Sequence, residues 1–316
     1  PARFRAAPGD QAIPAIPATP AAPAAPAAPA TLSPRVCIPV FPGTNCEDES
    51  DIAFRRAGAE VEQIIFRWKT AEQAEQSITE LAEAIGRSQI LMLPGGFSAG
   101  DEPDGSAKYI AAVLRNSEVR EAVEALLETR DGLILGICNG FQALVRTGLL
   151  PYGEYRRPSA EMPRLSVNSI GRHVSRYVRT VAESAASPWL TAIDPGTVHT
   201  VPVSHGEGRF TADGRLMRSL SDRGQVAFRY CDETGQPAMR YPDNPNGSVE
   251  AVEGIISPDG RILGKMGHSE RTGNGLALNI PGSKDQRLFE SAVRYYTGNR
   301  YRAEKSHYTD KAKERV

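Results

Sequence analysis

Several features that would assign this chain to other protein classes are missing from its sequence. No apolar run is long enough to cross a bilayer, and the N-terminus lacks the charged and apolar segments of a secretory signal. The formal net charge of -1 lacks the basic excess that is typical of nucleic-acid binders. We therefore expect a cytoplasmic protein that acts on neither a membrane nor a nucleic acid.

Cysteine is also scarce. The four cysteines are scattered along the chain, without the close pairs that are typical of zinc sites: Cys37, Cys46, Cys138 and Cys231. Such spacing suits a reducing compartment better than a disulfide framework. The sequence therefore predicts no metal site in this chain.

Composition divides the chain into three parts. Residues 1–34 are rich in alternating proline and alanine, which form neither a helix interior nor a central strand and favour an extended spacer. This segment is either a tail or, as we favour, an interdomain linker that follows another domain. Residues 35–298 have the patterning of a globular domain, and residues 299–316 form a polar C-terminal tail.

The domain begins with short apolar runs that alternate with amphipathic segments. Strands are predicted at 36–41, 61–66, 89–93 and 132–137, with helices capped by Asn45 and spanning 70–85, 117–129 and 139–147. Further strands are predicted at 165–170, 177–181, 198–203, 226–230, 249–256 and 262–266, before a helix at 285–296. The pattern indicates an α/β fold whose mostly parallel sheet is flanked by helices, with additional antiparallel strands in the second half.

Three loops follow predicted strands of the first half. They come after Phe41, after Leu93 and at Cys138. In an open parallel sheet the functional site forms beyond the carboxyl ends of the strands. We therefore expect these three loops to converge.

The strongest chemical signal is Gly136-Ile137-Cys138-Asn139-Gly140, between a buried strand and a helix. Glycines on both sides permit a sharp turn that exposes the central side chain. A helix N-terminus favours the thiolate, and the N–H of Asn139 can donate to an oxyanion. We expect Cys138 to be a nucleophile, although a lone cysteine is more often a small buried hydrophobe.

A glycine-rich loop, Pro94-Gly95-Gly96-Phe97-Ser98, directly follows another strand. Glycine lets the backbone approach a ligand and turn an N–H inward, so Gly96 is the expected second oxyanion donor. A phosphate cradle is the alternative use, but the loop lacks the Lys-Ser/Thr ending of a P-loop.

A thiol nucleophile needs a base and a group that orients the base. Two segments supply both: His205-Gly206-Glu207 and His268-Ser269-Glu270. Extended residues two apart point the same way, so each histidine can lie beside its glutamate. The glycines after His205 indicate a mobile loop, yet periodicity alone does not choose between the two histidines.

Together these segments resemble the class I glutamine amidotransferases, which have a flavodoxin-like fold. The subset resembled is the glutaminase part of phosphoribosylformylglycinamidine synthase, over roughly residues 35–298. The motifs that carry the resemblance are Gly136-Ile137-Cys138-Asn139-Gly140-Phe141-Gln142, Pro42-Gly43-Thr44-Asn45-Cys46-Glu47, Pro94-Gly95-Gly96-Phe97-Ser98, Ser204-His205-Gly206-Glu207-Gly208 and Gly267-His268-Ser269-Glu270-Arg271.

The resemblance implies a catalytic triad: Cys138 attacks the glutamine amide, His268 transfers the proton and Glu270 orients His268. It implies that His205 lies in a loop of the glutamine pocket, to which we also assign Gly95, Phe97 and Gln142. Many family members read Met-Pro-His-Pro-Glu around the base, whereas this chain has Gly267 and Ser269 in place of the prolines. The His-x-Glu spacing survives, so the difference concerns the rigidity of the loop more than catalysis.

The resemblance also implies that ammonia from L-glutamine passes through a thioester reaction to an ATP-dependent synthetase in purine biosynthesis. That synthetase acts on formylglycinamide ribonucleotide, and the linker suggests that it precedes this domain on the same polypeptide. Since the chain has no P-loop, we expect no cofactor here, with ATP and Mg held by the synthetase. The alternatives are a stand-alone hydrolase of gamma-glutamyl compounds or peptides and a catalytically silent interaction module.

Overall fold

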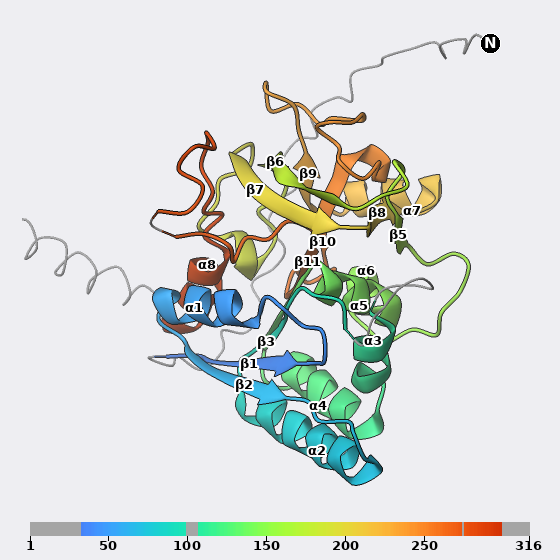
Figure 1. The fold of residues 1–316 in the computed structure, drawn as a ribbon, viewed down its shortest axis with the longest axis vertical. Coiled ribbons are helices and arrows are strands. Elements are labelled where there is room, and N and C mark those ends of the chain that lie inside the picture. Colours follow the sequence, from blue (N-terminus) through green and yellow to red (C-terminus); the bar gives the residue numbers. More distant parts are fainter. Residues whose placement is uncertain (1–32, 99–106, 274, 299–316) are drawn as a thin grey trace, which may run out of the picture.

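The computed structural model describes residues 33–98, 107–273 and 275–298 (Figure 1). Nearly all of the predicted linker and almost the whole predicted tail lie outside these residues. Within the described residues, every helix is too short or too polar to span a membrane.

A nine-stranded mixed sheet forms the centre of the described structure, in the order β2-β1-β3-β4-β11-β10-β9-β6-β7. The first five of these strands are parallel to one another, and the remaining pairs are antiparallel. The bounds are Arg35–Val40 (β1), Glu60–Ile65 (β2), Ile90–Leu93 (β3), Leu133–Ile137 (β4), Val174–Ala182 (β6), Val198–His205 (β7), Val226–Tyr230 (β9), Val252–Ile256 (β10) and Ile262–Lys265 (β11). The predicted fold class is confirmed.

Helices cover the parallel part of the sheet on both sides (Figure 1). One side carries α1 (Glu47–Ala57) packed against α8 (Leu288–Thr297), and the other carries α2 (Ala71–Arg87) packed against α4 (Ser117–Glu128). Helix α3 (Lys108–Leu114) packs against both α4 and α5 (Asn139–Thr147), and α5 is followed by the short α6 (Leu149–Tyr152). Because both faces are covered, all residues of β3 and β4 are buried, which explains their uninterrupted apolar runs.

The strand order creates a switch point between β1 and β3. From β1 the chain first adds β2 on one side, and it then returns to place β3 on the other side of β1. Ligands of doubly wound sheets bind at such a point, beyond the carboxyl ends of the strands. The loops that follow β1 and β3 therefore flank the expected site.

Several elements, including α3, α6, β8 (Glu207–Thr211) and a helix after β8, were not predicted from the sequence. Helix α3 is short and begins after Ala107, which has a positive φ and provides no side-chain cap. Strand β8 pairs only with β5 (Arg164–Val167), in a separate two-stranded sheet, and helix α7 (Gly214–Asp222) follows it. The prediction that Asn45 caps the first helix was wrong, because Cys46 occupies that position.

Candidate active site

Cys138 occupies a sharp turn between β4 and α5, at the carboxyl edge of the parallel strands. Its φ of 52° and ψ of -105° are strained for a residue that has a side chain. The neighbouring glycines allow the turn, because a Cβ on Gly140 would lie 2.0 Å from the carbonyl oxygen of Leu93. A Cβ on Gly136 would lie 2.8 Å from the carbonyl oxygen of Gly140. The local sequence therefore holds the thiol at the end of the sheet.

The loops after β1 and β3 meet beside this turn. Thr44 and Gly96 form an isolated bridge, and the N–H of Phe97 donates to the carbonyl oxygen of Gly43 at 2.9 Å. Gly96 has a φ of 144°, and a Cβ there would lie 2.5 Å from the carbonyl oxygen of Gly43. Only glycine fits at position 96 without displacing the loop after β1, which accounts for glycine at this position.

Gly95 shows how closely the three loops converge. A Cβ on Gly95 would lie 2.8 Å from Cε1 of His268, 3.2 Å from Sγ of Cys46 and 3.4 Å from Cβ of Cys138. Residues that are far apart in the sequence therefore surround one point at the switch between β1 and β3. The loops after β1, β3 and β4 converge, as expected from the sequence.

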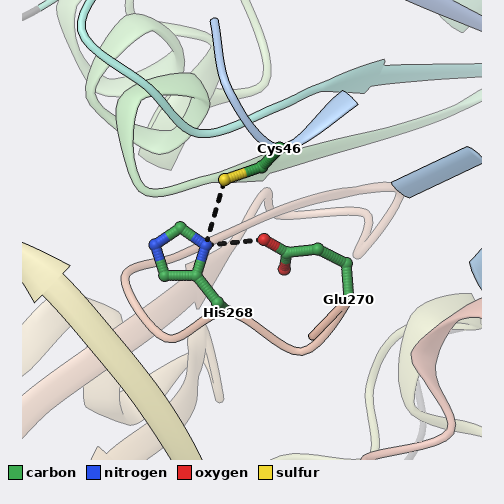
Figure 2. Close-up of side chains that lie close together, drawn as sticks. All are labelled: Cys46, His268 and Glu270. Atoms are coloured by element: carbon green, nitrogen blue, oxygen red, sulfur yellow. Dashed lines mark hydrogen bonds and ion pairs between the residues drawn. The ribbon is translucent and has the colours of Figure 1, made fainter. Parts of the chain in front are cut away.

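His268 and Glu270 lie directly after β11, which is parallel to β4, so they reach the same edge as Cys138. Nδ1 of His268 and Oε1 of Glu270 are 2.6 Å apart, and both side chains are buried (Figure 2). The second ring nitrogen, Nε2, is buried and has no hydrogen-bond partner within the described residues. Glu270 thus fixes the ring by one nitrogen and leaves the other for proton transfer.

The electrostatics of this pair favour a charged histidine. Burial alone lowers the pKa of His268, but the Glu270 carboxylate and the nearby thiols of Cys138 and Cys46 raise that pKa well above its ordinary value. Burial likewise raises the pKa of Glu270, but His268 outweighs it and lowers that pKa below its ordinary value. The pair is therefore an imidazolium next to a carboxylate at neutral pH.

Cys46 is a neighbour of His268 that sequence reasoning did not single out. Its Sγ lies 3.7 Å from Nδ1 of His268 (Figure 2). It also receives a hydrogen bond from Nη2 of Arg271 at 3.0 Å. Both residues stand in motifs that the sequence shows: Cys46 in the loop after β1, and Arg271 directly after Glu270. Their contact depends on the packing of α1 against the loop that follows β11.

Three potential metal ligands, Cys46, His268 and Glu270, lie within 4.8 Å of one another. Their geometry suits a hydrogen bond better than a metal ion. Two nitrogen or oxygen ligands of a tetrahedral zinc ion stand about 3.3 Å apart, which exceeds the 2.6 Å between His268 and Glu270. The guanidinium of Arg271 on the Cys46 sulfur also opposes a second cation there.

His205, the second candidate base, has a different environment. It is the buried last residue of β7, not a member of a mobile loop, and its Nδ1 lies 3.1 Å from Oδ1 of Asn168. Burial, together with the positive charge of His268, lowers the pKa of His205 to about 3. His205 is therefore neutral at neutral pH. Its ring-orienting partner is an amide, whereas that of His268 is a carboxylate.

The other residues assigned to the glutamine pocket lie around Cys138. Gln142, in the first turns of α5, accepts a hydrogen bond from the Asn139 side chain at 2.9 Å and donates to the carbonyl oxygen of Glu207. The same Asn139 side chain accepts from the N–H of Ser98 at 3.3 Å. These contacts tie the glycine loop, α5 and the β7–β8 turn together. Phe97, by contrast, is exposed.

Comparison with known proteins gives consistent results. Residues 33–296 match the CobB/CobQ-like glutamine amidotransferase domain family. The phosphoribosylformylglycinamidine synthase subunit PurQ of Symbiobacterium thermophilum is 38% identical over 266 residues, which cover 84% of this chain and 97% of that protein. The protein of the same name from Methanococcus maripaludis is 35% identical over 242 residues, covering 76% and 82%, respectively. The solved structure of PurLQS from Thermotoga maritima matches with a TM-score of 0.59 at 26% identity, covering 83% of this chain and 99% of that chain.

Proposed function

Because this chain belongs to the CobB/CobQ-like glutamine amidotransferase domain family, we propose that it is the glutaminase of a phosphoribosylformylglycinamidine synthase in purine biosynthesis. The family resemblance inferred from the motifs is thereby confirmed. One observation carries the enzymatic assignment: Cys138 occupies a strained strand-to-helix turn next to a buried His268–Glu270 pair. A silent interaction module would need neither the strain nor the buried charges.

The proposed reaction begins with glutamine bound over the turn at Cys138. In the resting site the proton of Cys138 is already held at Nε2 of the His268 imidazolium, and the Cys138 sulfur attacks the side-chain amide carbon. The N–H groups of Asn139 and Gly96 donate to the resulting oxyanion, and each such donor typically lowers the barrier by about 2.7–4 kcal/mol. Glu270 stabilises the imidazolium throughout.

Collapse of the tetrahedral intermediate breaks the C–N bond, and His268 returns the proton to the departing nitrogen, which leaves as ammonia. Water then attacks the thioester and gives a proton to Nε2 of the now neutral His268. The C–S bond breaks, glutamate leaves, and the Cys138 sulfur is restored beside the protonated ring. The positive charge of His268 helps to lower the pKa of His205, which stays neutral, and we assign His205 to the glutamine pocket rather than to proton transfer.

The second substrate of the complete reaction belongs to the partner. We propose that ammonia passes to a synthetase that holds ATP and Mg and converts formylglycinamide ribonucleotide, and that both act in the cytoplasm. The relatives are named as subunits, whereas the Pro/Ala-rich residues 1–34 support a synthetase that precedes this domain on one polypeptide. An experiment that adds the synthetase separately serves both arrangements.

The test measures glutamate release from glutamine by the parent chain and by Cys138→Ala, each with and without the synthetase. We expect activity that requires Cys138 and rises when the synthetase is present. Full activity with no response to the synthetase would point to a stand-alone hydrolase instead. A folded parent chain that releases no glutamate in any mixture would refute the proposal.

A further inference from the structure

A buried ion pair lies beneath the loop that carries His268. Nζ of Lys265, the last residue of β11, is 3.0 Å from Oε1 of Glu253 on the adjacent strand β10, and neither side chain has any exposed surface. The second carboxylate oxygen of Glu253 has no partner within the described residues. Burying two charges is costly, and apolar residues often replace such pairs without loss of stability. Stability alone therefore does not explain this buried pair.

Both members of the pair hold the backbone of Gly267. Oε1 of Glu253 accepts a hydrogen bond from the N–H of Gly267 at 2.6 Å, and Nζ of Lys265 donates to the carbonyl oxygen of Gly267 at 2.8 Å. That carbonyl belongs to the peptide bond that leads into His268. A Cβ on Gly267 would lie 2.7 Å from Oε1 of Glu253 and 3.0 Å from Nζ of Lys265, so the contact requires glycine here.

The same strand end also contacts the nucleophile. The main-chain carbonyl of Lys265 accepts a hydrogen bond from the N–H of Cys138 at 2.8 Å. The N–H of His268 in turn donates to the carbonyl oxygen of Pro202 at 2.9 Å. Lys265 thus makes two backbone contacts. Its carbonyl accepts from Cys138, and its ammonium group donates to Gly267, the residue before His268.

We propose that Glu253 and Lys265 are positioning residues, which fix the peptide on either side of Gly267 and thereby aim Nε2 of His268 at Cys138. Neither touches the reacting atoms. Charge-assisted hydrogen bonds on both sides of one glycine remove the freedom that this residue would otherwise give the loop. The inference deepens the proposed function, on which its turnover measurement rests.

The test replaces the pair without leaving an unpaired buried charge. Glu253→Leu/Lys265→Met removes both contacts with Gly267 and keeps an apolar core. Glu253→Gln/Lys265→Met retains an acceptor for the Gly267 N–H and changes the shape of the side chains less. Arg229→Met is the matched control, because Arg229 is also buried but pairs with Glu183 and Glu250, away from the catalytic loop.

Two readouts separate positioning from stability. We expect Glu253→Leu/Lys265→Met to unfold in urea like the parent but to lose at least about tenfold in kcat with KM nearly unchanged, since misplacing a catalytic group by about 1 Å can cost about 100-fold. The pH midpoint for alkylation of Cys138 by iodoacetamide should rise, because a misaligned imidazolium stabilises the thiolate less. Glu253→Gln/Lys265→Met should fall between this variant and the parent.

The control should keep the parental alkylation midpoint even if its stability drops. Parental kcat and a parental alkylation midpoint in Glu253→Leu/Lys265→Met would overturn the proposal. If that variant does not fold, the Gln/Met variant decides: a midpoint shifted beyond that of Arg229→Met supports positioning, and an equal midpoint overturns it. A parent that fails to hydrolyse glutamine would refute the proposed function, whereas the alkylation comparison would still decide the role of the pair.

Discussion

Replacing Glu270 by glutamine tests the central claim about the site, that a carboxylate keeps His268 charged and oriented. The substitution preserves the size of the side chain and leaves an oxygen that can accept from Nδ1 of His268. What it removes is the negative charge 2.6 Å from the ring, in a site where both side chains are buried. The charge is the main factor that raises the pKa of His268, so that pKa should fall in the variant.

The size of the effect follows from the contact that is lost. A hydrogen bond to a charged partner contributes about 1.5–3 kcal/mol, which corresponds to a loss of roughly 10- to 150-fold in kcat if the contact is fully used in the transition state. We expect a decrease within this range for glutamate release. The alkylation midpoint of Cys138 should also rise, because a neutral imidazole no longer stabilises the thiolate.

Stability should depend on pH in a defined way. The raised pKa of His268 contributes stability that is complete below its unfolded value and is lost as the pH rises through its folded value. The lowered pKa of Glu270 contributes stability above its unfolded value that is lost as the pH falls through its folded value. The difference in unfolding free energy between the parent and Glu270→Gln, measured in urea, should therefore be largest near pH 5–6 and smaller at pH 9.

Glu124→Gln is the control, because it removes a carboxylate from an exposed pair with Arg120 in the middle of α4. It should leave kcat unchanged and alter stability by no more than about 0.5 kcal/mol. Equal kcat in parent and Glu270→Gln would refute the reasoning, as would a stability difference that grows toward pH 9.

Three further changes test the packing around the site. Gly95→Ala places a methyl group 2.8 Å from the His268 ring and should lower kcat in the glutamate assay at least about tenfold, with a smaller effect on unfolding. Gly86→Ala, in the last turn of α2 with open space at the Cβ position, should instead raise the unfolding free energy by about 0.4–1 kcal/mol without changing kcat. Cys46→Ala removes the acceptor for Arg271 and should lower the unfolding free energy by about 1–3 kcal/mol, as measured in urea; an unchanged value would contradict the importance of that contact.

Much of the sheet and the turn at Cys138 could be predicted from the sequence because their signals are local. The apolar runs that became β1, β3 and β4 identify themselves by composition and by the loops that bound them. The glycines on either side of Cys138 indicate a sharp turn without knowledge of any other segment. Helix α3 was missed because the residue before it, Ala107, provides no side-chain cap that would mark its start in the sequence.

The choice of base shows where local reasoning ends. His205 and His268 each precede a glutamate by two residues, so spacing alone treats them as equals. Tertiary structure separates them, because His268 follows the strand next to β4 and has a carboxylate beside it, whereas His205 ends β7 and contacts Asn168. The amino acid that faces a histidine is decided by packing between distant segments.

The sequence alone determined the class of the fold, the turn that presents Cys138 and the two segments able to supply a base. Only the tertiary structure brought Cys46 and Arg271 to His268 and placed the Lys265–Glu253 pair beneath Gly267. The physical reason is the difference between local and non-local interactions. Turn geometry and hydrophobic periodicity are encoded within a few residues, whereas buried charges find their partners only after β10, β11 and β4 have aligned in one sheet.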